Sequence, residues 1–455
     1  MHCRWTFILV LGLALLPRDL GAQEAPDPAG GDAQEAPEPP EGEVQAEEPG
    51  QGEAQGEEPG QGGVEAEDLD EGARLEAERR ALEEALKLDL GQGQGAAVGD
   101  PGAVTGEVGA SALQSMNPEI SLILNVAAAA FSTDEPLQVG AHDPNKTGFV
   151  LQQLELFASS AVDPFFMMQT NIVFSQFGVE VEEAFATTHA LPGSLQVRAG
   201  QFLTRFGRQN PTHLHAWGFL DQPLVLGKFF GAEGSRGLGA ELSWLLPLPW
   251  FVEVIGSATD SAGECCARSF YGGRDLGVSS PLDLLATGAV KQFFELSGDW
   301  SLMLGLSTQS GPNPTGQGNR SGIYGVDLLV RYRPLDDPDR SSLSLQIEAL
   351  VRTRQVPGDV LVDEGGYAQL LADLDPSWQL GGRVELVTGL RGDPLDPEQT
   401  EARQRVSAQI TYRPSHFSKL RLQGSLDAPG WLPEPTLAVL LGFEVLIGAH
   451  GAHSY

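Results

Sequence analysis

YGVDLLVRYR, residues 324–333, alternates between two kinds of side chain along its whole length. One face is apolar with a tyrosine near each end, and the other carries glycine, aspartate, leucine and two arginines. Alternation with period two predicts a β-strand, and one apolar face beside one wet face suits the wall of a membrane barrel. Residues 378–386 and 405–413 repeat the pattern. Period two also fits a large soluble β-sandwich or barrel, whose apolar faces would form a core.

The gaps between such runs alternate in length. A strand crosses a bilayer in about 9–11 tilted residues, and outer-membrane barrels pair short periplasmic turns with long external loops. Short turns are predicted at 163–164, 191–193, 247–249, 297–299, 335–340, 375–377 and 414–418. Long loops are predicted at 133–147, 207–236, 260–283, 311–321, 355–365, 388–403 and 428–436, with 175–178 short where a long loop is due.

Strand-like runs begin near residues 120, 148, 165, 179, 194, 237, 250, 284, 300, 321, 341, 365, 378, 404, 418 and 437. Their number is even, as a closed antiparallel barrel with both ends on one side of a membrane requires. The sequence therefore predicts an all-β protein, a transmembrane antiparallel β-barrel of about 16 strands. The asymmetry of the turns and an export signal favour this fold over the soluble alternative.

The rest of the chain precedes the predicted barrel, which covers residues 117–455. Arg4, an apolar run and small residues up to Ala22 predict a cleaved signal peptide over 1–22. Residues 23–70 form an acidic low-complexity segment that we expect to be disordered, 71–90 a short helix or weak coiled coil, and 91–116 a flexible linker. The net charge of −34 and the lack of a basic patch argue against nucleic-acid binding.

Five segments follow one another along the barrel region: FVLQQLELFASSAVDP (149–164), GVEVEEAF (178–185), LQVRAGQF (195–202), YGVDLLVRYRPL (324–335) and RVSAQITYRP (405–414). Their order resembles the porin-like outer-membrane proteins of the phosphate-selective porin (porin O and P) superfamily. Some members of this group are labelled zinc-regulated TonB-dependent outer membrane receptors. Such a receptor needs a plug domain and about 22 strands, which residues 117–455 cannot both supply. The resemblance implies a passive pore in the outer membrane of a Gram-negative cell, with the N-terminal extension in the periplasm.

Loop 207–236 is far more apolar than a solvated loop, with Trp217 and Phe219 among its aromatic residues. The resemblance to general porins implies that this loop folds inward and narrows the lumen. The candidate constriction residues are Arg205, Arg208, His213, His215, Asp221, Lys228 and Glu233. The alternative is an apolar loop that caps the barrel mouth or contacts a neighbouring subunit.

Charged residues on the wet faces of the strands are the candidates for lining the lumen. They are Arg198, Glu180, Glu182, Asp327, Arg331, Glu348, Arg352, Arg383, Glu385, Arg405 and Arg421. Rings of charge set ion preference in passive pores, and small ions or solutes are the expected cargo. We expect outer-membrane lipid, the barrel-assembly machinery and a possible homotrimer as partners.

Other functions have weaker support in the sequence. His213 and His215 are weak zinc candidates, because a closed zinc site wants four ligands, and no metal or cofactor is expected. Cys265 and Cys266 are adjacent, which leaves a strained disulfide, free thiols or an inter-chain bridge open. Catalysis is not expected, since no nucleophile, base and orienting group are grouped. The alternative to a pore is a receptor or adhesin-like barrel. Such a protein would bind a ligand, possibly a metal such as zinc, through its external loops.

Overall fold

The computed structural model describes residues 118–176, 178–261, 266–271, 280–316, 318–334, 341–394 and 396–448. The predicted signal peptide, disordered segment, helix and linker of residues 1–116 lie outside the described residues. So do the predicted turn at 335–340, Cys265 and the end of the chain after 448.

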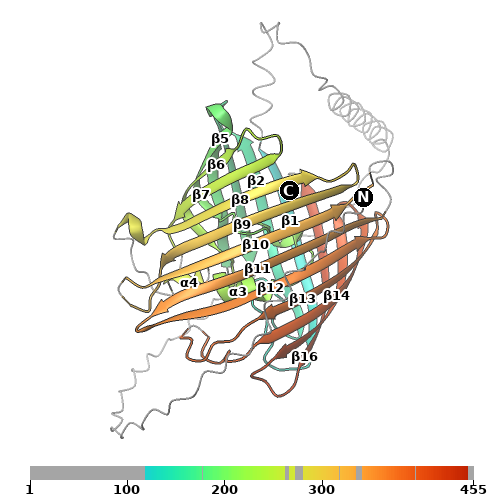
Figure 1. Ribbon diagram of the computed structural model, residues 1–455. Coiled ribbons are helices and arrows are strands. Elements are labelled where there is room, and N and C mark those ends of the chain that lie inside the picture. The colour runs from blue at the N-terminus through green and yellow to red at the C-terminus, as the bar shows by residue number, and fades with distance from the viewer. Residues whose placement is uncertain are drawn as a thin grey trace, which may run out of the picture. The chain divides into compact units, whose positions relative to one another are not determined.

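Sixteen antiparallel strands form one closed barrel in which each strand pairs with its neighbours in sequence and β1 pairs with β16 (Figure 1). The predicted fold class is confirmed. The strands are β1 (Glu119–Phe131), β2 (Gly148–Ala161), β3 (Phe166–Ser175), β4 (Gly178–Thr188), β5 (Leu195–Leu203), β6 (Arg236–Leu245), β7 (Phe251–Thr259), β8 (Leu285–Glu295), β9 (Trp300–Pro312), β10 (Arg320–Tyr332), β11 (Ser342–Val356), β12 (Asp359–Asp373), β13 (Trp378–Val387), β14 (Arg403–Ser415), β15 (Ser418–Pro429) and β16 (Thr436–Gly448).

The observed strand starts lie within one residue of the predicted starts in every case except β12, which begins at Asp359 and not near 365. The predicted long loop at 355–365 is therefore wrong. Only Pro357 and Gly358 separate β11 from β12, and Gly358 has a φ of +81°. Proline presets the first turn residue and glycine supplies the positive φ of the second, so this pair closes a tight hairpin inside a stretch that reads as a loop.

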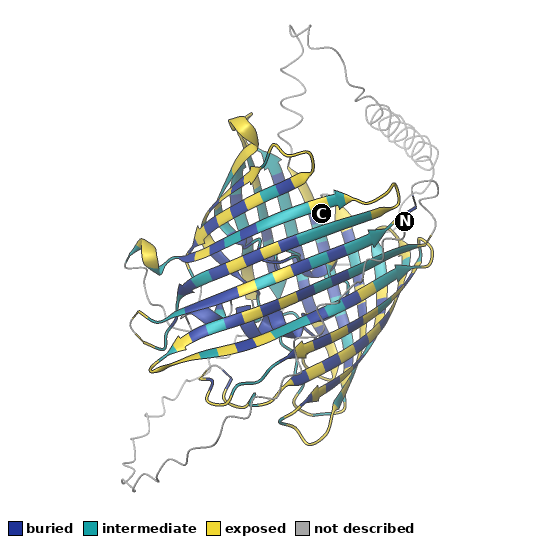
Figure 2. Ribbon diagram, in the orientation of Figure 1, coloured by how far each residue is buried: buried dark blue, intermediate teal, exposed yellow. Residues whose placement is uncertain are grey.

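The two faces of the strands differ as their sequences predict, and Figure 2 shows buried and exposed positions alternating along the barrel wall. Outward positions such as Val384, Val406 and Leu422 are exposed and apolar, whereas inward positions such as Arg383, Arg405 and Arg421 are buried. Trp300 packs at a tilt against Tyr332 and Trp378 against Tyr412, with ring centroids 4.9 and 4.7 Å apart, at the short-turn ends of their strands. Aromatic residues at the edges of an apolar band are typical of barrels in membranes.

Helices are few and short in the described residues. There they are the 3-10 turns Pro192–Ser194, Leu214–Ala216 and Pro281–Asp283, and the helices α3 (Leu224–Phe230) and α4 (Arg268–Tyr271). None of the helices in the described part of the chain has both the length and the apolar character to span a membrane.

Among the described residues, the largest buried apolar cluster lies between α3 and the barrel wall. Leu224, Val225, Phe229 and Phe230 of α3 pack with Phe206, and further members come from α4, β8, β10, β11, β12 and β13. Because α3 belongs to the connection between β5 and β6, this cluster joins one loop to strands of the opposite half of the barrel.

Candidate functional site: a loop fixed inside the barrel

Residues 204–235, which connect β5 to β6, form the candidate site and are called the inward loop below. The loop bonds to side chains on β2, β4, β9, β11, β13, β14 and β15, through Glu155, Glu183, Ser307, Glu348, Arg383, Arg405 and Gln423. A segment bonded to strands on all sides of a closed barrel must lie within it. Figure 1 shows α3 within the outline of the barrel, behind the front strands and near α4.

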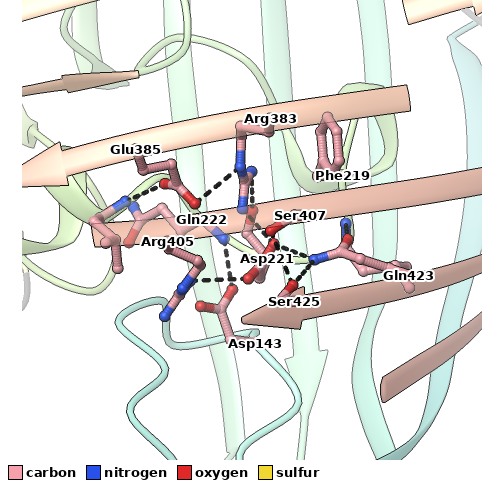
Figure 3. A network of polar contacts seen from close by, with 12 residues as sticks. Asp143, Phe219, Asp221, Gln222, Arg383, Glu385, Arg405, Ser407, Gln423 and Ser425 are labelled. Carbon is pink, nitrogen blue, oxygen red and sulfur yellow. Dashed lines mark hydrogen bonds and ion pairs between the residues drawn. The ribbon is translucent and has the colours of Figure 1, made fainter. Parts of the chain in front are cut away.

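Three side chains of the barrel wall bind Asp221 of the inward loop (Figure 3). Arg383 Nη2 donates to its Oδ1 at 2.5 Å, Arg405 Nη1 to its Oδ2 at 2.9 Å, and Gln423 Nε2 to its Oδ1 at 2.8 Å. Burial opposes the charged carboxylate, but Arg383 and Arg405 hold the pKa of Asp221 below its ordinary value. A buried charge needs this kind of compensation, so the two guanidinium groups fix where Asp221 sits.

Backbone groups of the inward loop are also matched by side chains of the wall. Glu348 Oε1 accepts from the N–H groups of Arg208 and Gln209 at 3.1 and 2.7 Å. Glu385 accepts from Leu224 N–H at 2.8 Å, the first turn of α3, where N–H groups lack helical partners. Inward-facing carboxylates of the wall therefore accept hydrogen bonds from backbone N–H groups of the loop. Moving the loop by one residue would leave these N–H groups without their partners.

Gly207 allows the close approach of the loop to β11. Its φ is +58°, and a Cβ built on it would lie 2.5 Å from Glu348 Oε2. Any other residue would both strain the backbone and push the Glu348 carboxylate away from the loop.

His213 and His215, the weak zinc candidates, lie stacked with ring centroids 6.0 Å apart. His213 contacts Glu182 and Glu183 through its two ring nitrogens, each at 3.0 Å, and His215 Nδ1 lies 2.8 Å from Glu155. Burial opposes a charge on His213, but Glu182 and Glu183 raise the pKa of its imidazole well above the ordinary value. Within the described residues, no three His, Cys, Asp or Glu side chains are placed to hold a metal ion. The histidines anchor the loop to β2 and β4.

Lys228 and Arg352 form a further anchor at the long-loop end of the barrel. Arg352 Nη2 lies 2.5 Å from Asp363 and its Nη1 donates to the carbonyl oxygen of Lys228 at 3.3 Å. Lys228 itself lies 3.4 Å from Asp363 and donates to the carbonyl oxygen of Thr388. Burial lowers the pKa of Lys228, because its charge is taken out of water.

A second group of charges lies on β5 to β10 and on the first residues of the inward loop. Arg205 lies 2.8 Å from both Glu241 and Glu253, and Arg198 2.9 Å from Glu241. Lys291 pairs with Asp327 at 2.9 Å and donates to Gly207 O at 2.5 Å. Arg208 donates to the sulfur of Met303 on β9 at 3.3 Å.

The remaining predicted residues fall into the same two groups. Arg421 donates to the carbonyl oxygens of Trp217 and Phe219 in the inward loop, whereas Arg331 is half-buried on β10. Glu180 lies near the long-loop end and pairs with Arg236. The structure thus brings most candidate constriction residues into contact with candidate lining residues.

The sequence reasoning missed the contribution of loop 132–147. His142 Nε2 lies 3.4 Å from Glu233 Oε2, and His142 Nδ1 lies 3.0 Å from Gln152 O. Burial opposes the imidazolium, but the bond and charge of Glu233, helped by Glu182, raise the pKa of His142 to about 9. No local pattern reveals this pair, because 91 positions separate its members and nothing in the loop predicts their contact.

Asp143 ties the same loop to the inward loop. It accepts from Gln222 N–H at 2.9 Å and from Gly140 N–H at 2.8 Å. Burial and the neighbouring charge of Asp221 raise the pKa of Asp143 to about 6. Cys266 is disulfide-bonded and accepts a hydrogen bond from Arg236. Nothing is described for Cys265.

Comparisons with solved structures return bacterial outer-membrane proteins. The anion-selective porin from Comamonas acidovorans is 12% identical, with 73% of this chain and 99% of the porin covered and a TM-score of 0.49. The outer membrane channel DcaP of Acinetobacter baumannii is 11% identical, with 72% of this chain and 97% of the channel covered and a TM-score of 0.49.

Sequence comparison gives one significant relative. No family model matches the chain. A protein of Aquifex aeolicus (strain VF5), described as an uncharacterized protein, is 30% identical over 336 residues, which cover 68% of this chain and 71% of that protein. This chain and the Aquifex aeolicus protein belong to one family.

Proposed function

We propose that the protein is a passive diffusion channel for small ions or solutes in the outer membrane of a Gram-negative cell. The observation that carries this proposal is a closed barrel with an apolar outer face and a polar interior that is crossed by one fixed loop. An apolar outer face suits lipid, and a polar interior suits water and ions. The inward loop would narrow the lumen and set its charge. The resemblance to the phosphate-selective porin superfamily supports the proposal.

The direct test is conductance of the purified barrel in a planar lipid bilayer. Stepwise single-channel currents would support the proposal. A barrel that inserts in a folded form and carries no current would refute it. A homotrimer is proposed with the channel, and three equal conductance steps per insertion would support that assembly.

A ligand-binding outer-membrane barrel is the second candidate function. A cavity of about 570 Å³ at the long-loop end is lined by α3, loop 132–147, loop 388–402 and Trp431. Cavities of this size are usual for small-molecule sites. Absence of current together with saturable binding of a small solute would favour this alternative over the channel.

Loss of Arg205 and Arg208 should change ion selectivity. In the double variant Arg205→Ala/Arg208→Ala, Glu253 loses its contact with Arg205 and Glu241 keeps only Arg198, so the potassium-to-chloride permeability ratio should rise. The rise should be on the order of fivefold, because a charge contact in a wet lumen is worth about 1 kcal/mol. Reversal potentials in a salt gradient measure it, and conductance should also increase. Arg391→Ala, on the exposed part of loop 388–402, is the control and should alter neither quantity. An unchanged reversal potential in the double variant would show that Arg205 and Arg208 of the inward loop do not determine ion selectivity.

The selectivity should also depend on pH through His142. With a pKa of about 9, His142 is cationic at pH 7 and loses its charge as the pH rises through about 9. Glu233 on the inward loop would then lose its imidazolium partner, while Glu182 on β4 keeps its contact with His213 and Gln152 offers only a carbonyl oxygen. Reversal potentials between pH 7 and 10 should therefore shift toward cations. The shift should vanish in His142→Gln and persist in His416→Gln, whose histidine lies in the exposed turn before β15. The same shift in both variants would show that another group titrates.

A further inference from the structure

The inward-facing charges of the barrel differ in their access to water. Side chains of Arg205, Glu253 and Lys291 keep 25, 20 and 18% of their surface exposed. Those of Arg352, Arg383 and Arg405 keep 0, 1 and 2%. We call the first region, on β5 to β10 with Arg205 at the adjoining start of the inward loop, the open wall, and the second, on β11 to β15, the sealed wall.

The sealed wall is dry because the inward loop lies directly on it. Asp221 occupies the space between Arg383 and Arg405, and the ring of Phe219 packs on the Arg383 guanidinium at 4.6 Å. Gln409 on β14 donates to Gly218 O at 2.7 Å, and Arg421 on β15 to Trp217 O at 3.0 Å. Near these bonds the side chains of Arg383, Arg405 and Arg421 keep only 1, 2 and 4% of their surface exposed. The more exposed charges of these strands, Asp373, Arg413 and Lys419, lie at the short-turn ends. The arginines under the loop therefore hold it in place.

Contacts on the open wall are sparser and leave the cations facing water. Arg205 is more exposed than its partner Glu241, and Lys291 more than Asp327. Met303 and Arg331, on β9 and β10, are half-buried. The inward loop reaches this wall mainly through its first residues: Arg205 pairs with Glu241 and Glu253, the backbone of Gly207 bonds to Ser307 and Lys291, and Arg208 donates to Met303. Ions follow surfaces that remain hydrated, since a dry ion pair offers neither water nor a free charge.

We infer that ions pass on one side of the inward loop only, along the open wall, so that Arg205, Glu253, Lys291 and Arg331 determine conductance while the arginines of the sealed wall are structural. This inference rests on the proposed channel function. It assigns selectivity to a minority of the inward-facing charges that the sequence offers.

Cysteine accessibility tests the route. Met303→Cys and Ser301→Cys place a thiol on β9 in the open wall, and Ser407→Cys and Ser425→Cys place one on β14 and β15 in the sealed wall. Ser407 and Ser425 are buried and hydrogen-bonded to each other at 2.9 Å, and serine-to-cysteine changes preserve their size. Each folded variant is treated in the bilayer with a negatively and a positively charged methanethiosulfonate, and labelling is measured by mass spectrometry.

Open-wall variants should be labelled within minutes, should lose conductance, and should shift selectivity with the sign of the reagent. Sealed-wall variants should stay unlabelled while folded. The parent, in which Cys266 is disulfide-bonded, gives the background. Sealed-wall labelling that lowers the current, or open-wall labelling that leaves it unchanged, would overturn the inferred route while leaving the channel function intact. A parent that carries no current would instead refute the channel function itself, and the route with it.

Discussion

Replacing Asp221 with asparagine should destabilise the folded barrel by about 3–5 kcal/mol, the usual cost of removing one partner from a buried ion pair. The change leaves Arg383 and Arg405 without the carboxylate that both contact, at 2.5 and 2.9 Å. We expect a lower midpoint of urea unfolding in detergent. We also expect larger and noisier single-channel currents, because the middle of the inward loop loses its attachment to the sealed wall.

Glu253→Gln is the matched control for Asp221→Asn. It also removes a carboxylate from an arginine, but the pair with Arg205 is part-exposed, and such pairs are worth about 0–1 kcal/mol. Its unfolding midpoint should therefore move little. Equal destabilisation by the two variants would show that burial around Asp221 does not distinguish the sealed wall from the open wall.

Truncation of Phe230 to alanine should cost about 3–5 kcal/mol, as is typical for a buried aromatic side chain. Phe230 is fully buried and packs edge-on against Phe206, with ring centroids 5.0 Å apart. The cavity left behind should loosen α3 on β12 and β13. Limited proteolysis of the folded variant should then cut within residues 204–235, and urea unfolding should shift to lower concentration.

Leu282→Ala provides the comparison for Phe230→Ala. Leu282 is 77% exposed in a turn before β8, so its truncation should change stability by less than about 0.5 kcal/mol. If Phe230→Ala left both the protease pattern and the unfolding curve as in Leu282→Ala, the inward loop would not depend on its apolar cluster.

The fold could be predicted because its signals are local. Alternation with period two and the turn residues define each strand without knowledge of any partner, so the predicted starts match the structure almost everywhere. The exception, at Pro357-Gly358, arose because residues 355–365 contain proline, two aspartates and glycines, which read as a loop. In the structure the same residues form one tight turn followed by the start of a strand.

The inward loop could be predicted only in part. Its apolar composition predicts that Phe219 and Phe230 are buried, and both are buried in the structure. The local sequence does not show which charges of the wall the inward loop neutralises. Asp221 contacts Arg405 on β14 only when the barrel has formed as far as that strand. From the sequence, Arg383 and Arg331 look alike as inward-facing charges, yet one is buried under the loop and the other is half-buried on the open wall.

The partners of the inward loop also set the order in which the protein can be assembled. Leu224 bonds to Glu385, 161 residues further along the chain, and Leu220 to Gln423, 203 residues further along. Contacts between residues so distant in sequence form late, since the intervening chain must first be ordered. Until β13 to β15 are in position, α3 and its phenylalanines have no cover, and an uncovered apolar segment promotes aggregation. The long-range contacts that fix the inward loop in the folded barrel therefore also make the incomplete chain prone to aggregation. Its apolar loop needs protection until β13 to β15 have been added.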